Sequence, residues 1–182
     1  MEWRAARARN NEWLRPWDAT SPAGRADQPP TFGHMVRALT SEARAGRIMP
    51  FVVTLRGDLV GQLTVGGITW GSLRSAHIGY WVDQAVAGRG ITPTAVALAG
   101  DHLFAIGLHR VEINIRPENT ASLRVVRKLG FRDEGLRPRY LHIDGEWRDH
   151  LSFALIAQEL APGEGLLARY HRYLRDTPLR NT

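Results

Sequence analysis

The sequence predicts one α/β domain built on a single mixed β-sheet of about six strands flanked by helices. Strand-like and helix-like stretches follow one another in the order helices, strands, helix, strand, helix and a final hairpin. The chain of 182 residues has the length of one domain and is long enough to bury a sizeable core. We find no internal repeat, no low-complexity segment and no second core in the sequence.

Two helices and a proline-rich loop are expected before the first strand. Residues 2–14 place small and apolar side chains at helical spacing, so we expect a helix there. Residues 13–30 contain four prolines, which predicts a loop. A second helix is expected to begin at Thr31 or Gly33 and to run to residue 45, because the glycine that follows suits a helix end.

Apolar runs bounded by turn residues predict the strands. The expected strands are residues 48–55, 59–69, 76–83, 109–117, 131–143 and 146–156, and the expected helices between them are residues 92–106 and 118–130. Glycine turns close the first and the last hairpin, at Gly57 and Gly145. We expect residues 1–160 to form the domain and residues 161–182 to form a basic tail with a short helix.

The composition excludes several classes of protein. The sequence has no cysteine, which excludes disulfides and cysteine nucleophiles. No run approaches the roughly 18 apolar residues of a membrane helix, and the arginine-rich start lacks the apolar core of a signal peptide, so we expect a cytoplasmic protein. The net charge is +6, and every basic residue except Lys128 is an arginine. This surplus suits a polyanionic partner, but a coding bias toward arginine and alanine is the simpler explanation.

A glycine loop stands at the start of the helix expected for residues 92–106. Gly88 and Gly90 tolerate positive φ, so the backbone N–H groups can turn toward one point, and the helix N-terminus adds further donors. Pro93 suits the first helical turn. The loop lacks the spacing of a dinucleotide-binding G-x-G-x-x-G and lacks the G-K-[ST] of a Walker loop. It predicts a phosphate site, with a plain strand–turn–helix junction as the alternative.

Two longer motifs connect this loop to a known family. The stretches GYWVDQAVAGRGIT (residues 79–92) and RPENTASLRVVRKLGF (residues 116–131) resemble those of the GNAT acyltransferases, which are acetyl-CoA-dependent N-acetyltransferases. The resemblance covers roughly residues 51–160. Residues 2–22 and the stretch DGEWRDHLSF (residues 144–153) resemble the RimJ/RimL branch, whose members acetylate the α-amine of protein N-termini.

The resemblance implies a GNAT fold and a binding site for acetyl-CoA. In that fold the fourth and fifth strands splay apart, and the pantetheine arm lies in the gap, paired with the backbone of the residue that corresponds to Val82. The residues implied to bind the pyrophosphate are Ala87, Gly88, Arg89, Gly90, Ile91 and Thr92, and Asn119 is implied to hold the cofactor arm. The alanine and the threonine at the ends of this loop depart from the family pattern. The first strand of the family is missing from the predicted order, and no metal is implied.

The resemblance also implies the catalytic groups. Ser122 matches the serine that the branch uses to protonate the leaving thiolate, and Val126 stands where many GNAT enzymes have a tyrosine. Ser122 and Asn119 could instead serve only the helix end. Some relatives place a glutamate base at the position of Asn114. Glu112 lies two residues earlier and so on the same face of the strand, which makes it the candidate base, acting through water. The alternative is that Glu112 is an ordinary residue of the sheet surface. The residues expected on the acceptor side are Trp13, Tyr80 and Tyr140.

These residues predict acetyl transfer to a primary amine, in the first place the α-amine of a protein N-terminus. An α-amine with a pKa of about 7.8 is partly neutral near neutral pH, whereas a lysine with a pKa of about 10.4 is almost wholly charged. A site without an evident strong base therefore favours the α-amine. The first alternative acceptor is a small-molecule amine, such as an aminoglycoside or a polyamine. The second alternative is a ribosome- or RNA-associated protein that binds CoA without turnover.

The expected partners follow from this function. They are acetyl-CoA and a protein N-terminus, with a ribosomal protein as the leading example. Neither DNA nor a membrane is expected as a partner, because the basic charge is spread along the chain rather than gathered in a nucleic-acid-binding motif. We expect the chain to be a monomer or a homodimer.

Overall fold

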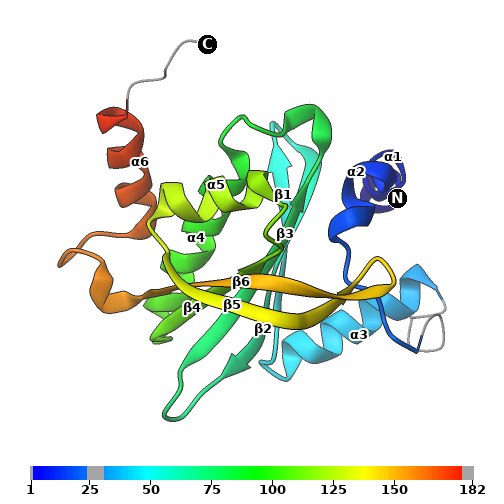
Figure 1. Cartoon of the computed structure of the whole chain (residues 1–182), viewed down its shortest axis with the longest axis horizontal. Coiled ribbons are helices and arrows are strands. Elements are labelled where there is room, and N and C mark those ends of the chain that lie inside the picture. Colours follow the sequence, from blue (N-terminus) through cyan, green and yellow to red (C-terminus); the bar gives the residue numbers. More distant parts are fainter. Residues whose placement is uncertain (1, 24–30, 178–182) are drawn as a thin grey trace.

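The protein forms one six-stranded sheet in the order β1-β2-β3-β4-β6-β5, in a computed structural model that describes residues 2–23 and 31–177 (Figure 1). The strands are β1 (Met49–Leu55), β2 (Asp58–Thr69), β3 (Ser75–Val82), β4 (Arg110–Ile115), β5 (Arg132–Ile143) and β6 (Glu146–Ile156). The helices are α1 (Glu2–Arg9), α2 (Asn11–Leu14), α3 (Phe32–Arg44), α4 (Ile91–Ala105), α5 (Thr120–Leu129) and α6 (Leu166–Asp176), and the short 3₁₀ helices are η1 (Arg15–Trp17), η3 (Gln84–Val86) and η4 (Ala157–Glu159). The predicted mixed α/β sheet of six strands is confirmed.

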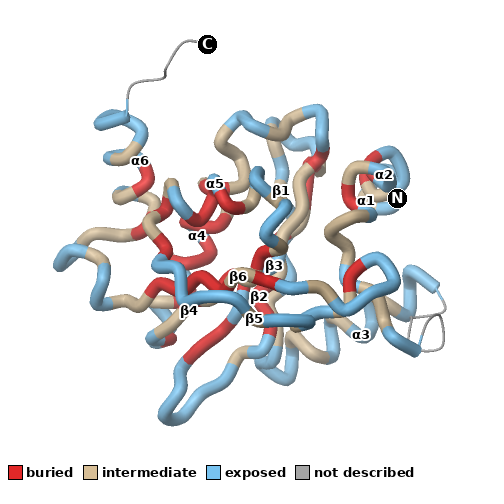
Figure 2. The backbone as a smooth tube through the Cα atoms, in the orientation of Figure 1, coloured by how far each residue is buried: buried red, intermediate tan, exposed pale blue. Residues whose placement is uncertain are grey.

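Helices cover both faces of the sheet. α4 and α5 lie on one side of it, and α1, α2 and α3 lie on the other (Figure 1). Buried residues gather between the sheet and the pair α4 and α5 (Figure 2). The largest fully buried side chains there are Leu63, Val65, Val96, Leu103, Val111, Val126, Leu129 and Leu155. The main hydrophobic core therefore holds the sheet against α4 and α5.

None of the described helices is long and apolar enough to cross a membrane.

The prediction of one helix over residues 2–14 is wrong, because the structure breaks it at Asn10 into α1 and α2. The Asn10 side chain is 2% exposed and makes two hydrogen bonds to the backbone. Its amide donates to the carbonyl of Ala6 at 2.9 Å, and its oxygen accepts from the N–H of Gln84 at 2.9 Å. An asparagine that bonds backbone groups in this way competes with the helical hydrogen-bond pattern. Through its bond to Gln84, Asn10 also attaches the first two helices to the segment that follows β3.

The other predicted helices and strands are present, with ends that shift by a few residues. The helix expected from Thr31 or Gly33 is α3, and the side chain of Thr31 accepts from the N–H of His34 at its start. Part of the predicted loop, residues 24–30, and the end of the predicted tail, residues 178–182, lie outside the described residues.

The short helix expected in the tail is α6, and it packs on α4. Asp101 of α4 accepts hydrogen bonds from the N–H groups of Leu166 (2.5 Å) and Leu167 (3.1 Å), and so holds the first turn of α6. Leu166 and Tyr170 are 0% and 2% exposed and belong to the core. The boundary at residue 160 stays a prediction.

The sheet is incomplete along one of its pairings. β3 and β4 are parallel neighbours, but their pairing is short. It begins where Ser75 lies opposite Arg110 and ends where His77 lies opposite Glu112. Beyond His77 the two strands separate. This is the gap expected between the fourth and fifth strands of the family. It lies between β3 and β4 here because no described strand precedes β1.

Candidate active site

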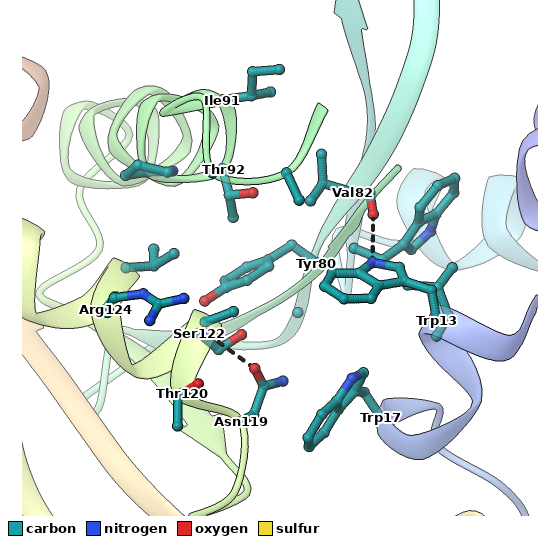
Figure 3. Close-up of a pocket in the computed structure, with 18 of the residues that line it drawn as sticks. Trp13, Trp17, Tyr80, Val82, Ile91, Thr92, Asn119, Thr120, Ser122 and Arg124 are labelled. Carbon is teal, nitrogen blue, oxygen red and sulfur yellow. Dashed lines mark hydrogen bonds between the residues drawn. The ribbon is translucent and has the colours of Figure 1, made fainter. Parts of the chain in front are cut away.

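A cleft of about 600 Å³ opens where β3 separates from β4 (Figure 3). Four parts of the chain line it: the α2–η1 segment, the paired ends of β2 and β3, the glycine loop that leads into α4, and one side of α5 with the turn before it. The predicted site residues in its lining are Trp13, Tyr80, Val82, Ala87, Gly88, Gly90, Ile91, Thr92, Asn119 and Ser122. The predicted site residues outside its lining are Arg89, Glu112 and Tyr140.

The backbone of β3 turns polar groups toward this cleft. The N–H of Asp83 donates to the carbonyl of Val60 at 2.7 Å, so this pair of residues is a hydrogen-bonded one. Hydrogen-bonded and non-hydrogen-bonded pairs alternate along antiparallel strands. The backbone groups of Val82, and of Tyr80 two residues earlier, therefore point away from β2 and into the gap left by β4. An extended ligand can pair with them as a further strand would.

The glycine loop shapes one end of the cleft. Gly88 and Gly90 have φ of +80° and +81°, a region that glycine adopts without strain. α4 begins directly after Gly90 without a side-chain cap, and Thr94 bonds back to the Gly90 carbonyl through its N–H (3.2 Å) and its hydroxyl (2.9 Å). The first N–H groups of α4 and the positive end of its dipole are thus available to an anion. Arg89 is not part of this lining and instead lines a groove between β1 and α4.

α5 brings a capped helix end and two cations to the opposite wall. The Asn119 Oδ1 atom accepts a hydrogen bond from the Ser122 N–H at 3.0 Å and so caps the helix. Arg124 and Lys128 follow on the side of α5 that faces the cleft. Their positive charges and the nearby helix N-termini make this part of the cleft suitable for a negatively charged ligand.

The Tyr80 side chain points from β3 toward Ser122 (Figure 3). Its hydroxyl is buried, and it has no hydrogen bond of normal geometry to any residue in the described part of the chain. Burial raises the pKa of Tyr80 to about 12, and the neighbouring Ser122 hydroxyl acts in the opposite direction. The phenol is therefore protonated at neutral pH.

The far end of the cleft has aromatic walls from the α2–η1 segment. The indole N–H of Trp13 donates to the carbonyl of Val82 at 3.2 Å. Arg116, which follows β4, donates to the carbonyl of Pro16 at 2.7 Å and lies 5.4 Å from the centre of the Trp17 ring. Sequence reasoning missed Arg116, although it opens the second family motif. It ties the wall of the cleft to the turn that carries Asn119.

Sequence reasoning also missed several polar residues of the lining, which are Asp18, Gln62, Thr64 and Glu118. Gln62 accepts from the indole N–H of Trp3 at 2.6 Å and donates to Thr64 at 3.0 Å. The alternation of polar side chains at 62 and 64 along β2 was the available signal, because alternate residues of a strand share one face. Asp18 forms an ion pair with Arg7.

The predicted base lies beside the cleft rather than in its wall. Glu112 stands opposite His77, at the last position where β3 and β4 still pair, so it lies before the point at which the gap opens. Its carboxylate accepts from Arg110 at 2.7 Å and from Arg137 at 3.4 Å. Tyr140 on β5 is also apart from the lining, with the Arg137 guanidinium 4.9 Å from its ring centre. Within the described ranges, no group of three or more His, Cys, Asp or Glu side chains is placed to hold a metal ion.

Comparisons with known proteins agree with this geometry. The family description "Acetyltransferase (GNAT) domain" matches residues 2–132. The solved structure "Mycobacterium smegmatis RimJ in complex with CoA-disulfide" is 42% identical, with a TM-score of 0.84, over 93% of this chain and 82% of that chain. The ribosomal protein uS5-alanine N-acetyltransferase of Escherichia coli is 27% identical over 166 residues, which are 88% of this chain and 85% of that enzyme. The protein named "Probable N-acetyltransferase YjcK" of Bacillus subtilis is 39% identical over 99 residues, 54% of this chain and 55% of YjcK.

The cleft fits the ligand that the RimJ structure contains. CoA has an extended amide-bearing arm and a negatively charged pyrophosphate. The gap beside Val82 offers backbone partners to the arm, and the loop at Gly88 and Gly90 offers N–H donors to the phosphates. The family match covers most of the chain. The chain therefore belongs to the GNAT acetyltransferase family, as an acetyl-CoA-dependent acyltransferase similar to the RimJ and RimL enzymes.

Proposed function

We propose that the chain acetylates the α-amine of a protein N-terminus, with a ribosomal protein as the first candidate. The observation that carries this proposal is the cleft, which has a phosphate cradle at one end and tryptophan walls at the other. The similarity to an enzyme named for acetylating an alanine of ribosomal protein uS5 supports the acceptor. We place the reaction in the cytoplasm as part of the same proposal.

The residues of the cleft would divide the binding of acetyl-CoA among them. The backbone of Val82 would pair with the pantetheine arm, and the side-chain amide of Asn119 would hold the same arm from α5. The loop residues Gly88, Gly90, Ile91 and Thr92 would bind the pyrophosphate through their N–H groups. Ala87 would only shape the loop, because its N–H already donates to the carbonyl of Gln84 at 3.2 Å. Arg89 would contribute only its backbone N–H, since the residue lines another groove and not the cleft. Trp13 would form part of the acceptor wall.

Acetyl-CoA would supply the acetyl group as a thioester, whose carbon–sulfur bond breaks as the amine nitrogen bonds the acetyl carbon. The amine gives up one proton and the leaving sulfur gains one. In our proposal the Ser122 hydroxyl donates to that sulfur. Glu112 would receive the proton of the amine only through water, because Arg110 and Arg137 already bind its carboxylate.

The acidic side chains in the described lining of the cleft all pair with arginines, so none of them is free to act as a strong base. This favours an α-amine as the acceptor. The two carboxylates in that lining are Asp18 and Glu118, and each is paired with an arginine, Arg7 and Arg116 respectively. An amine that is already partly neutral needs less help from a base than a lysine does. This is why we choose the protein N-terminus over a side-chain or polyamine nitrogen.

The test is an acetylation assay with the purified protein, acetyl-CoA and short peptides that carry both a free N-terminus and an internal lysine. Mass spectrometry of fragments locates the acetyl group, and N-terminally blocked peptides and spermidine serve as comparison acceptors. We expect the acetyl group on the α-amine alone. Transfer to spermidine but to no peptide would overturn the proposed acceptor, and CoA binding without any product would overturn the enzymatic role.

The role of Ser122 has its own test. Ser122→Ala is expected to lower kcat by roughly a hundredfold or more, and to leave the dissociation constant of acetyl-CoA within about twofold. Ser72→Ala is the matched control, because Ser72 is exposed in the turn between β2 and β3. Full turnover by Ser122→Ala would show that the serine only decorates the helix end.

A further inference from the structure

The hydroxyl of Tyr80 is a buried polar group without a regular partner in the described part of the chain. Buried hydroxyls are nearly always hydrogen-bonded in folded proteins, and an exception calls for a reason. A phenylalanine in this position would fill the same volume and would avoid the penalty of an unsatisfied group. The oxygen of Tyr80 therefore has a use that packing alone does not supply.

The surroundings of this oxygen restrict what it can do. The side chain lies in the wall of the cleft and points to Ser122 on the first turn of α5 (Figure 3). The Ser122 hydroxyl is the polar group that influences the ionisation of Tyr80. One turn further along α5, Val126 is 0% exposed and brings no polar atom toward the tyrosine. The side chain toward which Tyr80 points therefore offers a hydroxyl oxygen that can accept the phenolic hydrogen.

The hydrogen of the Ser122 hydroxyl can point in two directions, toward the cleft or toward a backbone carbonyl of its own helix. A serine inside a helix readily donates to the carbonyl three or four residues before it, which here is that of Asn119 or Glu118. A hydrogen bonded in that way points along the helix and away from the cleft. A serine oxygen can accept one hydrogen while it donates its own. A donor that approaches the oxygen from the β3 side therefore helps to decide where the serine hydrogen goes.

We propose that Tyr80 is a positioning residue, which donates a hydrogen bond to Ser122 Oγ and so directs the Ser122 hydrogen into the cleft, toward the leaving sulfur. This inference rests on the proposed function of Ser122. It assigns to Tyr80 a task different from the acceptor-side position expected from the sequence. The order of donors runs from Tyr80 to Ser122 to sulfur, and each hydrogen stays on its own oxygen until the carbon–sulfur bond breaks.

The ionisation of Tyr80 agrees with a donor role. Burial holds the pKa of its hydroxyl at about 12. The group therefore remains protonated from about pH 6 to 9, the range that the assay should cover. Removal of the hydroxyl should then lower the rate by the same factor at every pH in that range.

The first test compares Tyr80→Phe with the native protein and with Tyr173→Phe, a matched control on α6 that lies outside the cleft. We expect Tyr80→Phe to lower kcat by about tenfold. Its Tm should stay close to that of the native protein, because phenylalanine keeps the buried ring and its volume. The dissociation constant of acetyl-CoA and the shape of the pH profile should stay unchanged. A native kcat in Tyr80→Phe, or a loss explained by a lower Tm, would overturn the proposal.

The second test asks whether Tyr80 acts through Ser122. A double-mutant cycle measures kcat for Tyr80→Phe, Ser122→Ala and the two together. We expect Tyr80→Phe to cause no further loss once Ser122 is alanine. Losses that multiply would mean that Tyr80 acts on the substrate independently, which contradicts the proposal.

The cycle also separates this inference from the proposed function. Full activity of Ser122→Ala would overturn the role of the serine and the role of Tyr80 together. Full activity of Tyr80→Phe beside an inactive Ser122→Ala would remove Tyr80 alone. A native protein that releases no CoA thiol with any peptide would instead refute the proposed acceptor.

Discussion

The indole N–H of Trp13 donates a hydrogen bond to the backbone carbonyl of Val82, across 3.2 Å. Trp13 belongs to α2, and Val82 is the last residue of β3. The bond uses a carbonyl that faces the gap between β3 and β4, and it leaves the N–H of Val82 to a ligand. One contact therefore joins the wall of the proposed acceptor end to the strand that would hold the cofactor arm.

Trp13→Phe removes this bond and keeps an aromatic ring. We expect the KM for a peptide acceptor to rise by roughly five- to tenfold, the equivalent of one hydrogen bond of about 1 kcal/mol. The affinity for acetyl-CoA, measured by calorimetry, should change by less than about twofold. Trp147→Phe in the exposed hairpin is the control. An equal loss in both affinities would mean that Trp13 supports the cofactor site rather than the acceptor site.

Gly88 and Gly90 differ in the space around them, although both have left-handed φ. A Cβ at Gly88 would meet nothing within 4 Å, whereas a Cβ at Gly90 would lie 3.2 Å from the Tyr170 hydroxyl. Gly88→Ala should therefore add only backbone strain of about 1–2 kcal/mol, and Gly90→Ala should add a steric contact. We expect calorimetry to show weaker acetyl-CoA binding for both variants and the larger loss for Gly90→Ala.

A third glycine serves as the control for that comparison. Gly57 also has a left-handed φ, of +95°, and open space around it, but it lies in the turn between β1 and β2. Gly57→Ala should lower the Tm without an effect on acetyl-CoA affinity. If all three variants bound acetyl-CoA equally well, the loop would not be the phosphate site.

Two substitutions can separate the capping role of Asn119 from its proposed role in holding the cofactor arm. Its oxygen caps α5, so Asn119→Ala should lower the free energy of unfolding by about 1 kcal/mol, which is about 2–4 °C in Tm for a chain of this size. Asn119→Asp keeps an oxygen that accepts from the Ser122 N–H, and we expect it to restore the Tm. Aspartate has no N–H to donate, so its acetyl-CoA affinity should remain low. Native affinity in Asn119→Asp would restrict this residue to its capping role.

The stability of the fold should depend on pH through Glu134. Hydrogen bonds from Arg110 and then from Arg132 lower the pKa of Glu134 from 4.5 to about 2. The unfolded chain therefore takes up this proton at a higher pH than the folded one. The stabilisation is complete above about pH 4.5 and is lost as the pH falls toward about 2.

Urea unfolding at several pH values measures this effect. We expect Glu134→Gln to be less stable than the native protein at neutral pH, and to lose less of its stability between about pH 4.5 and pH 3. Glu12→Gln on the surface of α2 is the control for the loss of one surface carboxylate. Parallel curves for the native protein and Glu134→Gln would contradict the ion-pair explanation.

Much of the fold followed from local patterns. Apolar alternation and turn glycines located all six strands, and the glycine loop indicated which end of the cleft suits a phosphate. The family motifs then placed Val82, Asn119 and Ser122, which share one cleft in the structure.

The features that sequence reasoning missed depend on contacts between distant residues. Asn10 breaks the first helix because Gln84, 74 residues later, donates to it. Arg116 reaches the carbonyl of Pro16 across 100 residues. Glu112 falls outside the cleft because β3 and β4 separate only after its position, and no local pattern marks the residue at which two strands part.

The packing of α6 has a practical consequence for work with this protein. The Tyr170 hydroxyl lies directly behind Gly90, and Asp101 fixes the start of the same helix. A gene shortened after codon 160 would remove both the buried Leu166 and the support behind the glycine loop. Truncated versions designed for crystallisation or fusion should therefore retain the chain through Asp176, with any purification tag attached beyond that residue.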